Sequence, residues 1–264
     1  MIAIDLPPKI AFPKPAIVRA AGDLHRHDRR AIEREFGVRL PEPKLAMLPG
    51  MMPVGWAGGG VGFSSLSHVA SASSSTPDIT IPVAAAEYDF AVLFDYGANG
   101  SGEPSNTIPS GWLSAVTGGD GSNARIAMRY KMLGPSDPGA TVTGIDAETD
   151  DKLMLIFRPN VQLTTVTPTD MVAKMTSNNP SSQTINASGA TTPLIVVGCG
   201  MKYADTMSFS TESPSFDATE TSADQDALAG YSIYNIGDTP VDHTVDINDF
   251  GLNNGLCSGY FLFD

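Results

Sequence analysis

The segment that decides the fold is Arg125-Ile126-Ala127-Met128-Arg129-Tyr130-Lys131-Met132. Basic or small side chains alternate with apolar ones along it, so a strand places Ile126, Met128, Tyr130 and Met132 on one face. Thr244-Val245-Asp246-Ile247-Asn248 alternates in the same way. This period of two predicts half-buried β-strands.

Two other segments are apolar without interruption, namely Phe90–Phe94 and Leu153–Phe157. A strand that is apolar on both faces is expected in the middle of a sheet that is covered on both sides. We therefore predict that these two segments form central strands.

Similar short strand patterns recur from residue 79 to the end, separated by turn sequences such as Asn99-Gly100, Asp137-Pro138-Gly139 and Asn254-Gly255. The other expected strands are Ile79–Val83, Gly111–Thr117, Thr141–Ile145, Val161–Val166, Gln183–Ala187, Leu194–Met201, Thr206–Ser210, Tyr231–Ile236 and Ser258–Phe263. Short strands at this spacing predict an all-β fold, and we expect an antiparallel jelly-roll-type β-sandwich over residues 79–264.

Charge is unevenly distributed over the 264 residues, whose formal net charge is −13. Residues 1–50 hold nine basic and six acidic side chains, whereas residues 51–264 hold seven basic and 23 acidic ones. The acidic body would repel nucleic acid, so we exclude nucleic acid as its partner. We also expect no membrane segment, because no run of 18 apolar residues occurs.

Residues 1–53 hold eight of the 20 prolines, which prevents them from joining a sheet interior or a long helix. One short helix fits between Asp23 as N-cap and Gly37 as C-cap. We expect an extended anchoring arm that gains order on a partner surface. Its apolar anchors are Leu24, Ile32, Phe36, Met47, Leu48, Met51 and Met52, and its basic ones are Arg26, Arg29, Arg30 and Arg34.

Residues 54–78 are rich in glycine and serine. Their Gly58-Gly59-Gly60 run lacks the lysine and the spacing of a phosphate-binding loop. We interpret this segment as a linker or as the entry to a first strand.

A search for catalytic motifs finds none. The histidines His25, His27, His68 and His243 occur in no metal-binding or nucleophile motif. Nothing in the spacing of the carboxylates marks a glycosidase pair, so we expect neither an enzyme nor a cofactor.

Two weaker features stay open at this stage. Asp242, Asp246 and Asp249 fail the EF-hand spacing, which leaves a surface Ca²⁺ site only as an alternative to a solvated acidic turn. Cys199 and Cys257 have the surroundings of buried thiols, and a bridge between them is not excluded.

Aromatic side chains offer a β-sandwich another way to act, by stacking against sugar rings. The candidates for such a ligand platform are Trp112, Tyr231 and Tyr234, with Trp56 in the glycine-rich entry. A Gly-Trp pair at a strand start is more typical of a core anchor, which is the interpretation we favour for Trp112.

Several stretches resemble a family of largely uncharacterised structural proteins of tailed bacteriophages and prophages. They are Phe90–Asp95, Pro109–Trp112, Ile126–Lys131, Leu153–Asn160, Asn179–Ile185, Ala187–Gly189 and Tyr231–Asn235. Phe12–Ile17 and Met47–Met51 are similar to arms of phage structural proteins. The resemblance implies a virion protein and transfers no active-site residue.

The expectation is therefore a virion structural protein whose arm docks on other virion proteins of the head, neck, tail or fibre while its sandwich faces outward. The alternatives are a capsid decoration protein, a tail-fibre tip that binds a host-surface glycan, and, last, a glycan-degrading enzyme. A homo-oligomer is expected, and a trimer is plausible by analogy only.

Overall fold

A computed structural model describes residues 65–98, 105–121, 123–145, 151–163, 165–176, 182–201, 207–222, 225–247 and 254–264. The anchoring arm, its expected helix and Trp56 lie outside these residues. The described residues form strands and turns without a helix, which confirms the all-β fold. The strands are β1 (Leu66–Ser74), β2 (Ile79–Thr80), β3 (Phe90–Ala98), β4 (Leu113–Gly119), β5 (Ala124–Met132), β6 (Thr141–Val142), β7 (Asp151–Pro159), β8 (Val166–Thr176), β9 (Gln183–Ile185), β10 (Leu194–Met201), β11 (Phe209–Ser213), β12 (Ala218–Thr221), β13 (Ala227–Tyr234), β14 (His243–Ile247) and β15 (Asn254–Phe263).

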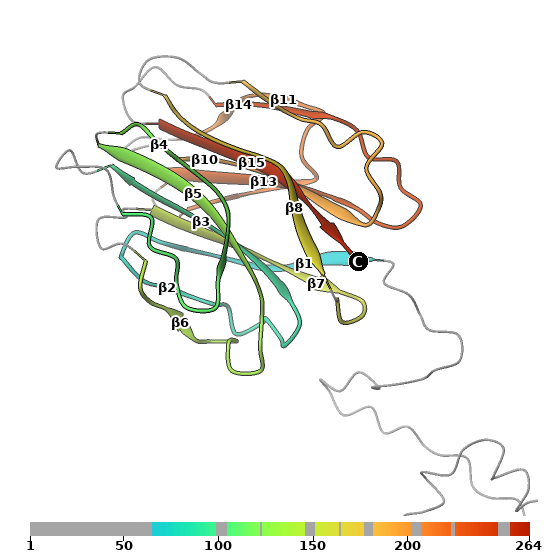
Figure 1. Ribbon diagram of the computed structural model, residues 1–264, viewed down its shortest axis with the longest axis horizontal. Coiled ribbons are helices and arrows are strands. Elements are labelled where there is room, and N and C mark those ends of the chain that lie inside the picture. Colours follow the sequence, from blue (N-terminus) through green and yellow to red (C-terminus); the bar gives the residue numbers. More distant parts are fainter. Residues whose placement is uncertain are drawn as a thin grey trace, which may run out of the picture. The chain divides into compact units, whose positions relative to one another are not determined.

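Two five-stranded antiparallel sheets form a β-sandwich (Figure 1). The first sheet has the order β1-β7-β3-β5-β4, and the second has the order β12-β13-β10-β15-β8. Each sheet is built from one continuous half of the chain. The expected jelly-roll connectivity is not confirmed, because a jelly roll distributes successive strands between its two sheets.

The two halves, residues 66–159 and 166–263, repeat one topology. We number the five sheet strands of each half along the chain and leave out the short strands. Both sheets then have the order 1-5-2-4-3. The short strands repeat as well, because β2 pairs with β6 in the first half and β9 pairs with β14 in the second. Strand β11 is the additional strand of the second half.

Side-chain contacts repeat along with the strands. The hydroxyls of Thr80 and Thr141 lie 3.4 Å apart across β2 and β6, and those of Thr184 and Thr244 lie 3.5 Å apart across β9 and β14. In the turns that follow β5 and β13, Asp137 and Asp238 each accept a 2.7 Å hydrogen bond from the backbone N–H three residues earlier. The paired strands and these turns of the two halves therefore correspond in register.

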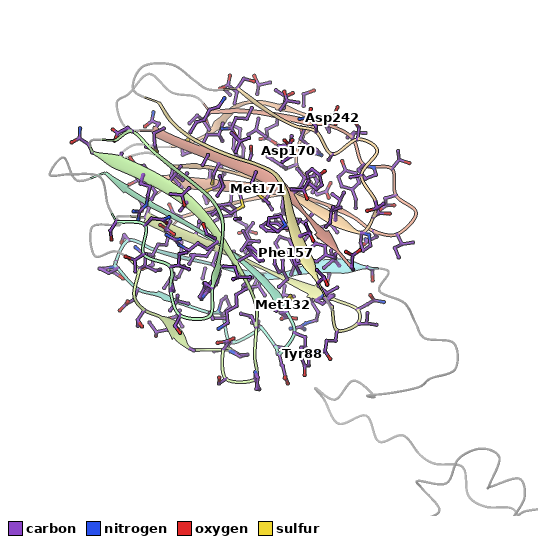
Figure 2. All side chains as sticks on the ribbon, in the orientation of Figure 1. Tyr88, Met132, Phe157, Asp170, Met171 and Asp242 are labelled. Carbon is purple, nitrogen blue, oxygen red and sulfur yellow. The ribbon has the colours of Figure 1, made fainter. Side chains whose placement is uncertain are left out.

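Three apolar layers stabilise the sandwich. The central layer fills the space between the two sheets, where Figure 2 labels Phe157. Strands β2 and β6 cover the outer face of the first sheet, and β9, β11 and β14 cover that of the second. The prediction for the apolar segments Phe90–Phe94 and Leu153–Phe157 is confirmed, because alternate residues of each enter the central and the outer layer.

The sheets approach each other closely at their edges. A Cβ on Gly118 of β4 would lie 2.6 Å from the carbonyl oxygen of Ala173 of β8, so only glycine fits there. At the opposite edge, the Ser71 hydroxyl of β1 donates a 2.8 Å hydrogen bond to Glu220 of β12. Each contact joins the first sheet strand of one half to the third sheet strand of the other, as a two-fold relation between the halves requires.

Candidate functional site

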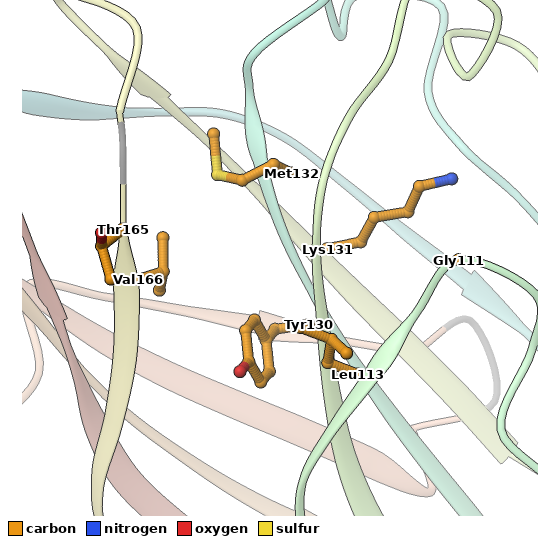
Figure 3. Close-up of a pocket in the computed structure, with 7 residues that line it drawn as sticks. All are labelled: Gly111, Leu113, Tyr130, Lys131, Met132, Thr165 and Val166. Atoms are coloured by element: carbon orange, nitrogen blue, oxygen red, sulfur yellow. The ribbon is translucent and has the colours of Figure 1, made fainter.

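A groove of about 290 Å³ opens at one end of the sandwich, between the start of β4, the end of β5 and the start of β8 (Figure 3). Its lining residues are Gly111, Leu113, Tyr130, Lys131, Met132, Thr165 and Val166. The groove lies at the rim of the central apolar layer, against which Tyr130, Met132 and Val166 pack. It is thus continuous with the interface between the two halves.

Strand alternation decides which side chains line the groove. Tyr130 and Met132 face the second sheet, and Tyr130 extends toward Thr165 and Val166 in Figure 3. Lys131 points to the opposite side, where its ammonium lies 2.8 Å from the carboxylate of Asp137. Leu113 is 56% exposed at the mouth. The groove therefore has apolar walls and a phenol at its base.

Packing fixes the Tyr130 ring from behind. Its centroid lies 5.3 Å from that of Phe261 and 6.1 Å from that of Phe90. Burial raises the pKa of the Tyr130 phenol above its ordinary value, so the hydroxyl remains protonated at neutral pH. The groove is suited to bind through ring stacking, apolar contact and one hydrogen-bonding hydroxyl.

The same position in the second half is filled by the protein itself. Val92 pairs with Tyr130, and the corresponding pair is Val197 with Tyr231. The imidazole of His68 stacks on Tyr231 at a centroid distance of 4.8 Å and an interplanar angle of 29°. The side-chain oxygen of Asn235 accepts a 2.7 Å hydrogen bond from the backbone N–H of Leu66.

Beside Tyr130, other residue types stand at the corresponding places. Pro168 pairs with Phe261 as His68 pairs with Phe157, and Gly134 precedes its turn aspartate as Asn235 does. The ring of Pro168 is saturated and puckered, so it does not stack flat on a tyrosine as an imidazole does, and Gly134 has no side chain to reach the start of β8. These two replacements explain why a groove is present beside Tyr130.

The described chain also enters the sandwich at this end. Ser65 and Asn160 exchange two hydrogen bonds, of 3.2 Å from the Ser65 N–H and 3.0 Å to its carbonyl oxygen. Leu66 then pairs with Pro159, at the end of β7. The C-terminal Asp264 is bonded to Thr165 of the groove through their backbones.

A second unusual cluster lies on the outer face of the first sheet. The guanidinium of Arg129 donates two hydrogen bonds to Asp95, of 2.6 and 3.3 Å, and Arg125 lies 3.9 Å from the same carboxylate. These residues and Lys152 are all at most 2% exposed. Burial raises the pKa of Asp95 more than the charges of Arg129, Arg125 and Lys152 lower it.

The second half carries no charge at the corresponding place. The residues of the second half that correspond to Asp95, Arg129 and Lys152 are Gly200, Gly230 and Leu256, as the strand registers show. Phe216 and Ile247 pack directly on the two glycines. One half thus has a buried ionic cluster where the other has a compact apolar contact.

The expected ligand platform is not assembled as a surface. Trp112 is 5% exposed and belongs to the outer layer beneath β2 and β6, in agreement with its interpretation as a core anchor. Tyr231 is 6% exposed, beneath His68. Tyr234 is half-buried, and its hydroxyl lies 2.8 Å from Nε2 of His243. Trp112 and Tyr231 are therefore not accessible to a sugar ring.

The acidic candidates for a Ca²⁺ site are only partly within the described residues. Asp242 accepts a 2.8 Å hydrogen bond from the backbone N–H of Ser188. Hydrogen bonding to the side chain of Ser188, together with this backbone bond, holds the pKa of Asp242 below its ordinary value. Asp246 is half-buried in β14, and Asp249 lies outside the described residues. Among the residues that the structure describes, no group of three His, Cys, Asp or Glu side chains is placed to hold a metal ion.

The two cysteines face each other across neighbouring strands. Cys199 of β10 is paired directly with Cys257 of β15, and both are buried free thiols, so they form no bridge. Burial raises the pKa of the Cys199 thiol well above its ordinary value, which keeps it unreactive.

Sequence reasoning assigned Tyr130 and Met132 to a buried face and did not identify the groove. The available signal was a weak internal repeat, in which Ile126-x-Met-x-Tyr130-x-Met132 corresponds to Ala227-x-Ala-x-Tyr231-x-Ile233 and an aspartate follows each tyrosine at the same distance. The expected arm anchors lie outside the described residues. Within the described ranges, no helix has the length and apolarity needed to cross a membrane.

Comparisons of the sequence with protein-family models and with curated proteins, and of the fold with solved structures, gave no match.

Proposed function

We propose that this protein is a structural protein of a tailed-bacteriophage virion. Residues 1–53 attach it to the head, neck, tail or fibre, and the sandwich faces outward. The observation that carries the proposal is the polarity of the chain. A basic, proline-rich segment precedes an acidic sandwich that the chain enters at the end where the groove opens.

The resemblance to phage structural proteins supports the same proposal. The stretches that carry it include Phe90–Asp95, Ile126–Lys131, Leu153–Asn160 and Tyr231–Asn235, which lie on β3, β5, β7 and β13. These strands lie inside their sheets, where packing limits the choice of residues.

The test is to delete residues 1–53 and to measure incorporation into particles by quantitative mass spectrometry. Loss of incorporation with retention of the β-sheet circular dichroism signal is expected. A matched full-length variant, with Arg26, Arg29, Arg30 and Arg34 changed to Ser, separates charge from the remaining arm chemistry. Wild-type incorporation of the truncated chain would overturn the anchoring role.

Copy number per particle distinguishes a capsid decoration protein from a neck, tail or fibre component. Hundreds of copies would indicate decoration of the capsid, and a few to a few dozen would indicate one of the other locations. Light scattering on the purified full-length chain tests the expected homo-oligomer, including the trimer.

A further inference from the structure

The groove beside Tyr130 has an internal template, because the second half shows how this fold occupies the same position. There, an imidazole lies flat on Tyr231 and a side-chain oxygen binds the backbone N–H at the start of an extended strand. The occupying group, His68, belongs to that strand, β1.

Three wall residues of the two positions are alike, whereas Leu113 corresponds to the smaller Ala218. Tyr130 corresponds to Tyr231, Met132 to Ile233 and Val166 to Leu66. Pro168 and Gly134 stand where His68 and Asn235 close the second position. Because the groove continues the interface between the halves, a ring placed in it would extend that interface in the manner of His68.

We propose that this groove binds a planar side chain, aromatic or imidazole, presented on an extended segment of a partner protein. The ring stacks on Tyr130 as His68 stacks on Tyr231, and its edge contacts Met132 and Val166. Leu113, which is 56% exposed, covers the remaining side. This inference names the partner's chemistry and rests on the sandwich alone, so it stands or fails independently of the virion assignment.

A protein segment fits these observations better than a glycan does. The template occupant is a side chain on a strand, and the neighbours of Tyr130 in the groove are mainly apolar, namely Leu113, Met132 and Val166. A sugar would leave most of its hydroxyls against these apolar walls without hydrogen-bond partners.

The test uses methyl NMR of the full chain labelled at Met, Leu and Val. The probes are the capped tripeptides acetyl-Gly-Trp-Gly-amide, acetyl-Gly-His-Gly-amide and acetyl-Gly-Leu-Gly-amide, and methyl β-galactoside. The Trp and His probes are expected to shift the Met132 and Val166 methyls. The Leu probe is expected to bind about tenfold more weakly, at the upper end of what a ring pair adds.

Two variants make the test specific. Gly134→Asn combined with Pro168→His reproduces the closure of the second half and should abolish the shifts. His68→Ala removes the stacked ring from Tyr231 and should add a second set of shifts, at the Leu66 methyls. The dispersion of the methyl spectra shows whether each variant is folded. If the double variant unfolds, the single variant Tyr130→Leu replaces it and is expected to weaken binding of the Trp probe.

Several outcomes would overturn the proposal. They are equal binding of the Leu and Trp probes, no shift with any peptide, shifts that persist in the folded Gly134→Asn/Pro168→His variant, and binding of the galactoside alone. A second copy of this chain as the natural partner would appear as concentration-dependent shifts of the same methyls without any probe, and those shifts should disappear in the closed variant.

Discussion

Tyr130 and Tyr231 hold equivalent positions in the two halves of the protein, and each ring packs against a phenylalanine of the opposite sheet. Tyr130 lies 5.3 Å from Phe261, and Tyr231 lies 5.2 Å from Phe157, measured between ring centroids. The contacts are reciprocal, because Phe261 and Phe157 are themselves equivalent. The tyrosines differ in what covers them, since His68 stacks on Tyr231 whereas Tyr130 borders the groove.

This difference predicts unequal costs of truncation. Tyr231→Ala should lower the free energy of unfolding by about 3–4 kcal/mol, because it leaves a cavity beneath His68. Tyr130→Ala should cost about 1–2 kcal/mol, because solvent reaches the groove and can fill the space. Urea unfolding followed by circular dichroism measures both. An equal or reversed order would contradict the distinction between a closed and an open position.

The ionic cluster makes a second prediction. Asp95→Ala should cost about 3–5 kcal/mol, because it leaves the Arg129 guanidinium buried without its carboxylate. Asp95→Leu combined with Arg129→Met and Lys152→Leu should recover most of this loss, since the second half is apolar at the same three places. Lys131→Met, which removes a partly exposed ion pair, is the matched control, with an expected cost of about 0–1 kcal/mol. A triple variant as unstable as Asp95→Ala would show that the fold does need these charges.

The packing of Phe216 on Gly230 of β13 leads to a third prediction. A Cβ on Gly230 would lie 2.0 Å from Cδ2 of Phe216, so Gly230→Ala should destabilise the protein by about 1–3 kcal/mol. Adding Phe216→Leu should relieve part of this cost, in a double-mutant cycle measured by thermal unfolding. Gly134→Ala is the control, because its Cβ would have no neighbour closer than 3.6 Å. Strictly additive effects at positions 216 and 230 would contradict the contact.

His243 predicts a dependence of stability on pH. It is 1% exposed and stacked on Phe216, and burial lowers its pKa below the ordinary 6.5 against the opposing influence of Asp217 and Asp242. The unfolded chain therefore takes up a proton near pH 6.5 that the folded chain resists. The contribution of neutral, buried His243 to the free energy of unfolding is fully present above pH 6.5 and is lost on acidification.

The measurement compares the wild type with His243→Phe at pH 7.5 and 5.5. The wild type should lose more free energy of unfolding over this interval, by at most about 1.4 kcal/mol per pH unit for one histidine. Taking the difference between the two proteins cancels the titration of the carboxylates. An identical loss in both would exclude His243 as the responsible group.

Sequence patterns predicted the interior of the fold better than its edges. The apolar segments of β3 and β7 identify central strands because both of their faces are buried. Strand β1 was expected as a linker or strand entry, because Leu66–Ser74 is rich in serine and alanine, which have little β propensity. In β8 only Val166 was anticipated. Pro168 interrupts the pattern, and an edge strand tolerates it because that strand needs hydrogen bonds on one side alone.

The candidate site was beyond the reach of the sequence for a different reason. The groove depends on Pro168 and Gly134, which occupy the positions equivalent to His68 and Asn235. This equivalence emerges only from the strand registers. The repeat itself is concealed because equivalent positions hold unlike residues, such as Arg129 and Gly230. The two halves thus share a topology while their side chains differ.

Each central sheet takes all of its strands from one half of the chain, and the halves meet through their side chains. In assembly terms, the two halves pack within one chain as the two subunits of a two-fold dimer would. Because both halves lie on the same chain, their side chains need not be identical. One rim is closed by His68, whereas the other is open beside Tyr130.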